Sequence, residues 1–350
     1  MGEYGVDIGI ATLTDVQPHT VDGRTRTVEQ RTAQIVRLGV QADQLGLDHL
    51  GVGEHHSVDF AVASPAVVLA AIASRTSRLR LTSSVSTLGA LDPVRLYQDF
   101  ATVDLISGGR AEITVGRSAY PDPFALFGEP IQFYDDLFTE KLDLLLQLRS
   151  SPRVTWRGRF RPALDDAPIV PRPVQDPLPI WVGVGGTPAS AERAGALGLP
   201  MILGYIGGTA DRLAALATIY RRAADRAGHA ESARVGVGVH FFAAEDETTA
   251  AETYPYYRDF LRPKSPGGGG FDVEPEHFRH GLSPNGHLAI GTPEQVTEKL
   301  LALHRIVGFD RLQALPDWGG LPEDAVTESV RHLAETIAPV LRTAIPVLST

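Results

Sequence analysis

The chain has 350 residues, 43% of them hydrophobic and 21% charged, so it can bury a large core and is neither disordered nor fibrous. Its formal net charge of -10 disfavours nucleic acid and anionic membranes as partners, because such surfaces would repel it, and leaves a small molecule as the expected partner. The absence of cysteine excludes disulfides, thiolate-bound metals and a thiol nucleophile.

Residues 1–7 lack the basic and apolar regions of a secretory signal peptide. The sequence also contains no run of about 18 apolar residues, the length that a membrane-spanning helix requires. We therefore expect a cytoplasmic protein.

Short apolar or β-branched segments recur along the chain, and a helical pattern follows each one, as is typical of β/α units that build a parallel sheet. The predicted strands are 6–12, 48–53, 78–85, 110–116, 178–184, 200–205, 233–243 and 311–316. Eight such units predict a (β/α)8 TIM barrel, a fold that spans roughly 200 to more than 400 residues as one unit. We therefore expect residues 1–350 to form a single domain.

Four predicted helices begin with a hydroxyl or carboxylate residue followed by proline, a favourable pair at the N-cap and the first helical position. Glycines end several helices before the next strand. The starts are Ser64-Pro65, Asp92-Pro93, Thr187-Pro188 and Thr292-Pro293, and the glycines are Gly46, Gly108, Gly109, Gly198 and Gly308.

Two segments interrupt the alternation of strands and helices. Residues 151–177, rich in proline and arginine, are expected on the amino-terminal face of the barrel, away from the chemistry. Residues 262–287 follow the seventh strand on the opposite, active face and include the run from Gly267 to Gly270. We predict that this insertion is a mobile lid, with a surface loop of no function as the alternative.

The functional groups of a TIM barrel follow the carboxyl ends of its strands. Glu54, His55 and His56 follow the second strand, where neighbouring side chains point in opposite directions, so a shared metal ion is disfavoured. His55 is a candidate general acid or base, with a structural histidine as the alternative. After the fourth strand, Gly116 and Arg117 place a guanidinium beside open backbone; this suits an anion, although a salt bridge is an equal alternative.

The turn after the fifth strand combines glycines with hydroxyl residues. Thr187 and Ser190 lie at a helix amino terminus, where unpaired N–H groups and the macrodipole favour a phosphate. A helix that is merely capped, as expected at Thr292, is the alternative. Trp318-Gly319-Gly320, after the eighth strand, is a rival phosphate site.

Several of these motifs, in this order, resemble the strand ends of the bacterial luciferase-like flavin monooxygenases. The resemblance runs almost without gaps from about residue 45 to 208 and extends loosely to the end. It implies an FMN-dependent oxidoreductase, most simply a monooxygenase that uses reduced FMN and O2 on a small organic substrate. The motifs are Glu54-His55-His56, the run from Ser84-Val85 to Asp92-Pro93-Val94-Arg95, Ser107 to Arg110, Gly116-Arg117 and residues 198–203.

The resemblance also implies roles for individual residues. His55 matches a histidine that moves protons around the reduced flavin, and Ser84 and Val85 match a pair joined by a non-prolyl cis peptide that supports the isoalloxazine ring. Tyr205 falls where luciferase has a tryptophan against the flavin. Arg117, Thr187 and Ser190 match the groups that hold the FMN phosphate, and Gly185 and Gly186 are the adjoining cofactor-binding positions.

Two departures from luciferase separate this chain from light emission. Gly116 stands where luciferase has a reactive cysteine, and Gly186 stands where it has a glutamate. An F420-dependent hydride-transfer enzyme and a non-catalytic flavin-binding subunit are the alternative functions.

The resemblance further implies protein partners. Reduced FMN would come from a partner flavin reductase or be reduced in place. Family members usually pair through helices on one side of the barrel, and Val67, Val68 and Ile72 exceed the apolar stripe that one inward helix face needs. A homodimer is therefore expected.

Overall fold

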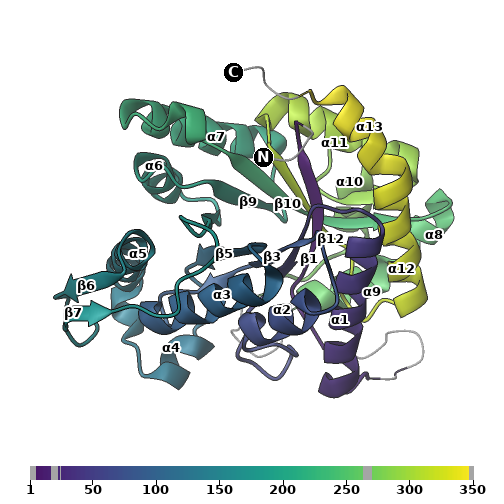
Figure 1. The fold of residues 1–350 in the computed structure, drawn as a ribbon. Coiled ribbons are helices and arrows are strands. Elements are labelled where there is room, and N and C mark those ends of the chain that lie inside the picture. Colours follow the sequence, from purple (N-terminus) through teal and green to yellow (C-terminus); the bar gives the residue numbers. More distant parts are fainter. Residues whose placement is uncertain (1–4, 17–22, 24, 263–269, 347–350) are drawn as a thin grey trace.

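The computed structural model describes residues 5–16, 23, 25–262 and 270–346. Neighbouring barrel strands pair in parallel, and β12 pairs with both β1 and β10, so the sheet closes on itself (Figure 1). The predicted (β/α)8 barrel and its eight strands are confirmed. The barrel strands are β1 (Asp7–Thr12), β2 (His49–Val52), β3 (Arg80–Ser83), β5 (Ala111–Gly116), β8 (Ile180–Val184), β9 (Met201–Tyr205), β10 (Val235–Ala243) and β12 (Arg311–Leu315).

Helices form the layer outside the strands (Figure 1). Those following the barrel strands are long enough to cover the sheet, whereas α4, α8, α9 and α10 are short pieces within connections. The helices are α1 (Val28–Gln44), α2 (Pro65–Ala73), α3 (Pro93–Ser107), α4 (Asp122–Phe127), α5 (Tyr134–Ser150), α6 (Pro188–Ala196), α7 (Ala210–Arg226), α8 (Glu247–Ala251), α9 (Tyr254–Leu261), α10 (Pro275–Leu282), α11 (Pro293–Val307), α12 (Glu323–His332) and α13 (Ala338–Ala344).

All four predicted N-cap and proline pairs begin a helix: α2, α3, α6 and α11. The Asp92 carboxylate accepts from the backbone N–H groups of Val94 and Arg95, and Thr292 forms a capping box with Gln295. Thr187 caps no backbone N–H of α6. Its hydroxyl is engaged elsewhere, which matters for the site described below.

The predicted third strand, 78–85, is shorter in the structure, and a separate short strand follows it. β3 ends at Ser83, and β4 (Ser86–Thr87) continues beside β5. The peptide bond between Ser84 and Val85, which lies between the two pieces, is cis. The cis peptide implied by the family resemblance is therefore confirmed.

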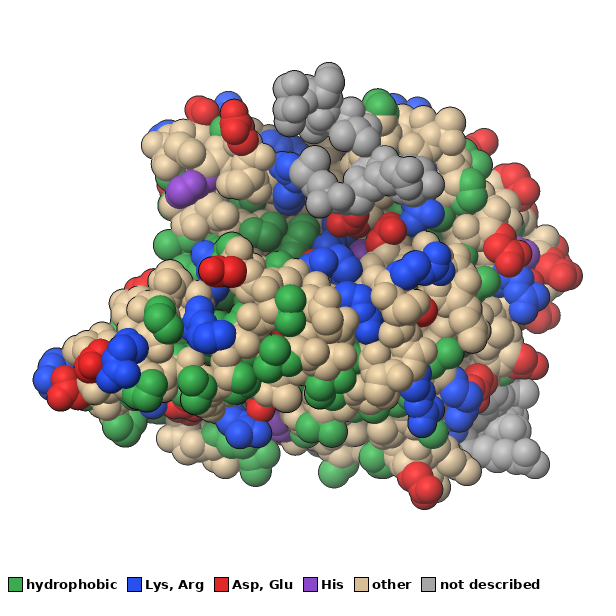
Figure 2. Space-filling view, in the orientation of Figure 1, with side chains coloured by type: hydrophobic (Ala, Val, Ile, Leu, Met, Phe, Trp, Pro, Cys, Tyr) green, Lys and Arg blue, Asp and Glu red, His purple; other side chains and the backbone are tan. Residues whose placement is uncertain are grey.

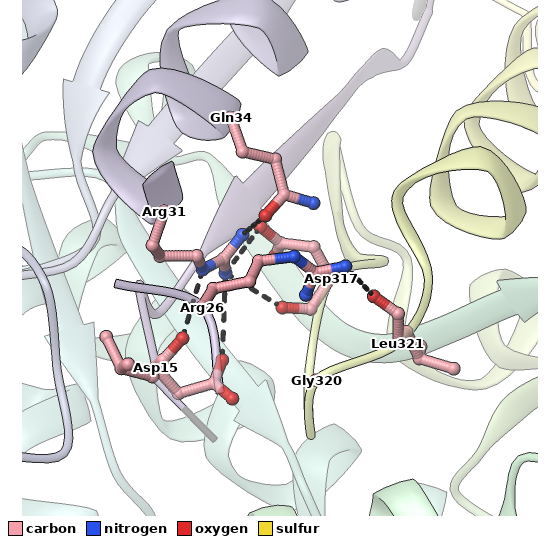
Figure 3. Close-up of a pocket in the computed structure, with 8 residues that line it drawn as sticks. Asp15, Arg26, Arg31, Gln34, Asp317, Gly320 and Leu321 are labelled. Carbon is pink, nitrogen blue, oxygen red and sulfur yellow. Dashed lines mark hydrogen bonds and ion pairs between the residues drawn. The ribbon is translucent and has the colours of Figure 1, made fainter. Parts of the chain in front are cut away.

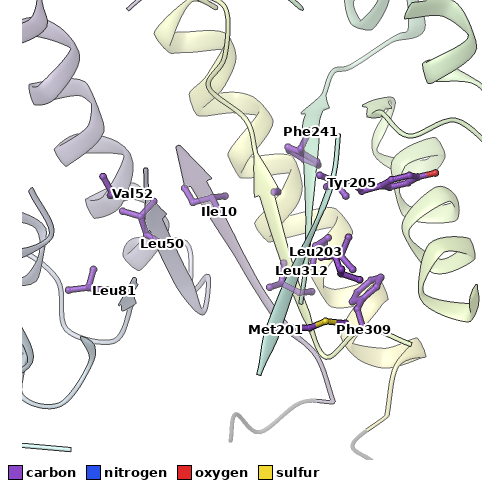
Figure 4. Packing of buried hydrophobic residues seen from close by; sticks show 14 of the residues in the cluster. Ile10, Leu50, Val52, Leu81, Met201, Leu203, Tyr205, Phe241, Phe309 and Leu312 are labelled. Carbon is purple, nitrogen blue, oxygen red and sulfur yellow. The ribbon is translucent and has the colours of Figure 1, made fainter. Parts of the chain in front are cut away.

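Alternate residues of each strand face the helices, and apart from Thr12 on β1 and Ser83 on β3 these are apolar. They form one buried cluster with the helix side chains (Figure 4). Burial of these side chains between the strands and the helices stabilises the fold. Representative members, each at most 1% exposed, are Ile8, Ile10, Leu50, Val52, Leu203 and Leu312.

Polar side chains fill the inside of the barrel at its amino-terminal end. The Glu112 carboxylate accepts hydrogen bonds from Arg80 Nε at 2.5 Å and from Arg311 Nη1 at 2.6 Å. The Arg311 guanidinium also lies 4.1 Å from the centre of the Trp181 ring. This end of the barrel is a packed floor, with its charges paired as burial requires.

Small residues line the inside at the carboxyl-terminal end. Strand alternation places glycine or alanine inward on six of the eight strands. Protein side chains already occupy the space beside Gly51, Gly116 and Gly183, whereas a Cβ on Gly204 would meet no atom within 4 Å, so the open room lies at the end of β9. The six positions are Ala11, Gly51, Gly116, Gly183, Gly204 and Gly238.

Residues 151–177 form a hairpin of β6 (Arg153–Trp156) and β7 (Leu164–Pro168). Its turn reaches the helix starts, because Arg161 Nε lies 3.0 Å from Asp92 Oδ2 at the N-cap of α3. Glu140 accepts from the backbone N–H groups of Arg159 and Phe160. The expectation that this whole segment stays on the amino-terminal face is wrong, because these contacts draw the turn towards the other end.

The insertion after β10 contains more regular structure than the sequence suggested. Helices α9 and α10 lie in or beside it, and β11 (Ala289–Gly291) then pairs with the end of β10. Lys299 Nζ on α11 donates to the Gly281, Leu282 and Leu288 carbonyls. Residues 263–269, with Gly267 to Gly269, lie outside the described residues, so a mobile lid stays a prediction.

Candidate functional site

The mouth of the barrel is open at two glycines. Gly204 is exposed although it belongs to a barrel strand, and a Cβ built on it would meet no atom within 4 Å. The same holds for Gly185 after β8. The structure therefore has free space at the ends of β8 and β9, where a ligand of a TIM barrel is expected.

Val85 forms part of the wall of this space. A Cβ on Gly116 would overlap the Val85 side chain, and one on Gly183 would stand 3.0 Å from Val85 Cγ1. Ser84 Oγ donates to Gln313 Oε1 at 3.3 Å, across the barrel interior. Both predicted residues, Ser84 and Val85, thus contact the inward face of the mouth.

Three predicted phosphate-binding residues come together beside this space. Arg117 Nη2 donates to Thr187 Oγ1 at 3.4 Å, and the Thr187 and Ser190 hydroxyl oxygens lie 2.8 Å apart. Arg117 follows β5, and the two hydroxyls lie at the start of α6, which follows β8. The group is therefore assembled from the ends of two barrel strands. A guanidinium and two hydroxyls at a helix amino terminus are well suited to bind a phosphate.

Arg212, which the sequence analysis did not single out, adds a second guanidinium. It lies in the first turn of α7, and its Nη2 donates to the Gly186 carbonyl at 3.5 Å. Gly186 has a φ of 119°, and a Cβ there would stand 2.9 Å from Arg212 Nη2. Glycine at this position therefore permits both the backbone turn and the approach of Arg212.

His55 lies in the loop after β2 within an aromatic enclosure. Its ring stacks on Phe60 with centroids 3.8 Å apart, and Tyr120 approaches edge-on at 5.8 Å. Burial lowers the pKa of His55 to about 3, and His56 acts in the same direction. The ring is therefore neutral at physiological pH, and its buried Nδ1 has no hydrogen-bond partner among the described residues.

Glu54 and His56 engage each other rather than the open space. His56 Nε2 lies 3.0 Å from Glu54 Oε1, and Thr87 donates its hydroxyl hydrogen to the same oxygen. These bonds tie the loop after β2 to β4. Among the described residues, His55 is thus the member of this triplet with a buried nitrogen that has no hydrogen-bond partner.

Tyr205 is not brought together with the other predicted site residues. It is 4% exposed and belongs to the cluster between strands and helices (Figure 4). Its ring lies 6.2 Å from that of His287. Gly204, the residue before it, has the inward position on β9.

The rival phosphate site after β12 is filled by protein groups. The Gly319 N–H donates to Asp15 Oδ2 at 3.0 Å, and a Cβ on Gly319 would overlap the Tyr256 carbonyl. Nearby, Arg31 Nη2 donates to Asp317 Oδ2 at 2.8 Å (Figure 3). This buried network joins the loops after β1 and β12. The single backbone N–H of Gly319 is engaged by Asp15 and is not available to a ligand.

The family model for luciferase-like monooxygenases matches residues 6–310. The chain belongs to this family. All the predicted site residues fall inside the matched region. No helix in the described ranges is long and apolar enough to cross a membrane, and no three His, Asp or Glu side chains there form a group that could hold a metal ion.

Two curated proteins are similar to this chain over about half its length. The chain is 32% identical over 173 residues to the F420-dependent glucose-6-phosphate dehydrogenase of Amycolatopsis mediterranei, covering 47% of this chain and 51% of that protein. It is 30% identical over 158 residues to the 4-hydroxyprotoasukamycin monooxygenase of Streptomyces nodosus, covering 45% and 43%. The chain thus spans about half the length of the curated relatives it matches.

Solved structures share the fold over nearly the whole chain. A monooxygenase from Streptomyces bottropensis superposes with a TM-score of 0.83 at 24% identity, covering 96% of this chain and 99% of that one. The oxygenating constituent of 3,6-diketocamphane monooxygenase from Pseudomonas putida, in complex with FMN, gives 0.75 at 20% identity, covering 95% and 98%. Both establish the architecture of the family barrel for this chain.

The sequence analysis singled out Gly116 and Gly185 but missed Arg212 and the other inward glycines, such as Gly204. The glycines carried a readable signal, because a glycine at alternate positions of a strand marks one face as a place of close approach. Arg212 carried a weaker signal: it lies in the first turn of the helix after β9, next to the predicted phosphate turn only in space.

Proposed function

We propose that this protein is an FMN-dependent oxidoreductase, and specifically a monooxygenase that uses reduced FMN and O2 on a small organic substrate. The observation that carries the proposal is the convergence of Arg117, Thr187 and Ser190 beside a barrel mouth lined with glycine. This combination fits a ligand such as FMN, which has a phosphate at one end and a flat ring system at the other.

The residues present fit FMN. Arg117, Arg212 and the two hydroxyls of α6 would hold the phosphate, and the wall made by Ser84 and Val85 would lie against the ring. Gly185 and Gly204 leave the space open, since a Cβ on either would meet no atom within 4 Å. When bound, reduced FMN supplies the electrons with which O2 is activated, and the protein positions it and excludes water.

His55 would act on protons near the ring. Its buried Nδ1 has no hydrogen-bond partner among the described residues, and with a pKa of about 3 the imidazole would pass a proton on rather than hold it. The stacking of Phe60 fixes the orientation of the imidazole. We assign the catalytic proton transfer to this residue.

Names in the family support the cofactor and the reaction class. One relative is a monooxygenase, and one structure of the same fold is an oxygenating constituent in complex with FMN. An oxygenating constituent is one part of an enzyme that has other parts. This supports a separate flavin reductase as the partner of this chain, with reduction in place as the alternative. The substrate is expected to be a small molecule that enters the same mouth.

F420-dependent hydride transfer is the second candidate. It is favoured by the relative at 32% identity, which is named for that cofactor. A non-catalytic flavin-binding subunit is disfavoured by the enclosed, unpaired His55. The two enzymatic candidates differ in the flavin that binds.

We also propose that residues 1–350 form one domain, because one closed sheet joins the strands of the described residues apart from the β6–β7 hairpin. We propose a homodimer as well. Of the three apolar residues on which it rested, Val68 and Ile72 are buried within the monomer, and Val67 alone is exposed, at 69%. Acidic, basic and apolar side chains are interspersed on the face in Figure 2.

The decisive experiment is titration with FMN and with F420, together with mass spectrometry of any flavin that copurifies. We expect FMN to bind and Arg117→Ala to weaken it by about 1.5 to 3 kcal/mol, the strength of a hydrogen bond to a charged group. Binding of F420 in preference to FMN would favour the second candidate. Unchanged FMN affinity in Arg117→Ala would contradict the placement of the phosphate.

A further inference from the structure

Asp135 contacts the same guanidinium that the proposed function assigns to the FMN phosphate. It lies in the first turn of α5, and its Oδ1 accepts from Arg117 Nη1 at 2.5 Å. The other terminal nitrogen of Arg117 donates to Thr187. Each terminal nitrogen keeps a second hydrogen, but a phosphate would bring another anion to a guanidinium whose charge Asp135 already pairs, so the two anions compete for Arg117.

We propose that Asp135 competes with the FMN phosphate for Arg117 and thereby keeps the flavin exchangeable. The inference rests on the FMN-dependent function proposed above and adds the residue that tunes its affinity. Asp135 would leave Arg117 when FMN arrives and return when FMN departs. The aspartate is thus a determinant of affinity, not a catalytic residue.

The exposure of the pair makes the exchange feasible. The Asp135 side chain is 67% exposed and that of Arg117 is 21% exposed. An ion pair with one partner so exposed is weak, because water screens it, and a phosphate offers Arg117 more charge and a matching two-oxygen face. The FMN phosphate therefore replaces Asp135 at Arg117. The affinity for FMN is reduced by the free energy of the ion pair that is broken.

Both partners of the exchange have support in their separated states. The freed Asp135 carboxylate stays in the first turn of α5, where the helix macrodipole favours a negative charge. The bound phosphate keeps Arg212 and the hydroxyls of Thr187 and Ser190 beside it. Asp135 is therefore not left buried without a partner when the phosphate binds Arg117.

An exchangeable flavin matches delivery by a separate reductase. In that arrangement the oxygenase must take up reduced FMN and release oxidised FMN during its working cycle, so a tight hold on the phosphate would slow turnover. A carboxylate that competes for the phosphate-binding arginine lowers affinity without removing selectivity for a phosphorylated flavin.

The test compares FMN and riboflavin binding in the full-length wild type and in Asp135→Asn. Removing the competing charge should tighten FMN about three- to fivefold, equivalent to about 0.7 to 1 kcal/mol at 1.4 kcal/mol per tenfold change. Riboflavin, which has no phosphate, should bind the two proteins equally. Faster FMN dissociation in the wild type than in the variant should accompany the difference.

Asp136→Asn is the matched control, because it removes the same charge from the next residue in the same helical turn. Asp136 pairs with Arg159 at 3.9 Å rather than with Arg117, so its replacement should leave FMN affinity unchanged. An equal gain in both variants would reduce the effect to net charge and overturn the proposal. FMN affinity that is unchanged or weaker in Asp135→Asn would also overturn it, identifying Asp135 as a residue that holds Arg117 in place. A wild type that binds no FMN at all would instead contradict the proposed function itself.

Discussion

The side chain of Val85 occupies the space that a side chain at Gly116 would need. Gly116→Ala should therefore force Val85 to shift, which destabilises the protein by about 1 to 3 kcal/mol, as overpacking of a well-filled site does. Urea unfolding measures the loss, and FMN titration should show weaker binding as well.

Two variants test the cause. Val85→Ala combined with Gly116→Ala should recover part of the loss, because the overlap is then relieved. Gly185→Ala should leave stability nearly unchanged, because its Cβ would point into open space. A Gly116→Ala protein as stable as the wild type would show that Val85 can move freely.

Arg212→Ala should weaken FMN binding by about 1.5 to 3 kcal/mol, because it removes a guanidinium from the phosphate end of the site. Riboflavin affinity should stay the same. Arg222→Ala, an exposed arginine on the same helix, serves as the control for a general loss of positive charge. Calorimetric titration of both flavins distinguishes the outcomes, and wild-type FMN affinity in Arg212→Ala would remove this residue from the site.

His55→Ala should leave FMN affinity nearly intact and slow turnover by about 100- to 10,000-fold, the usual contribution of a general acid or base. Because the pKa of His55 is lowered to about 3, its ionisation should not appear in the activity profile between pH 5 and about 9. Stopped-flow oxidation of bound, reduced FMN is the measurement. Traces identical to those of the wild type would exclude a proton-transfer role.

His240 should make the protein less stable in mild acid. Burial lowers its pKa from 6.5 to about 3, with His287 adding to the shift, and its Nδ1 lies 2.9 Å from the Tyr257 hydroxyl. Between these pH values the unfolded chain binds a proton that the folded chain does not, so stability falls as the pH falls, by up to about 1.4 kcal/mol per pH unit.

His240→Gln should reduce this acid sensitivity. The loss of stability between pH 7 and pH 5.5, measured by urea unfolding, should be about 1 kcal/mol smaller than in the wild type. His277→Gln, at an exposed position on α10, should leave it unchanged. Equal losses in the wild type and His240→Gln would mean that His240 takes up a proton without unfolding.

Arg31→Met should destabilise the protein by about 3 to 5 kcal/mol, because it leaves Asp317 buried without its cation. Arg37→Met offers a comparison on the same helix, since the Arg37 and Glu323 side chains are 56% and 42% exposed. That exposed pair should contribute about 0 to 1 kcal/mol. Similar losses in the two variants, measured by thermal or urea unfolding, would contradict the structural role of the buried network.

Local patterns were enough to predict the barrel and most of its boundaries. The signals used were the periodicity of strands and helices, N-caps such as Asp92 and helix-ending glycines such as Gly308. Each of these signals acts over a few residues, so a short segment is enough to specify a strand or a helix. The hairpin at residues 151–177 was misplaced, because its position depends on the contact between Arg161 and Asp92, which lie far apart in the sequence.

The sequence by itself determined that several of the predicted site residues gather at the mouth. The carboxyl ends of parallel barrel strands meet at one rim, so Ser84, Arg117 and Thr187 could be predicted as neighbours from their places after three strands. The tertiary structure alone decided which way each side chain faces and what else joins the group. Tyr205 faces the helices because a strand residue has one of two sides, and a shift of one residue exchanges them. Asp135 and Arg212 join the phosphate end because the first turns of α5 and α7 reach Arg117 and the Gly186 carbonyl, contacts between distant segments that no local pattern encodes.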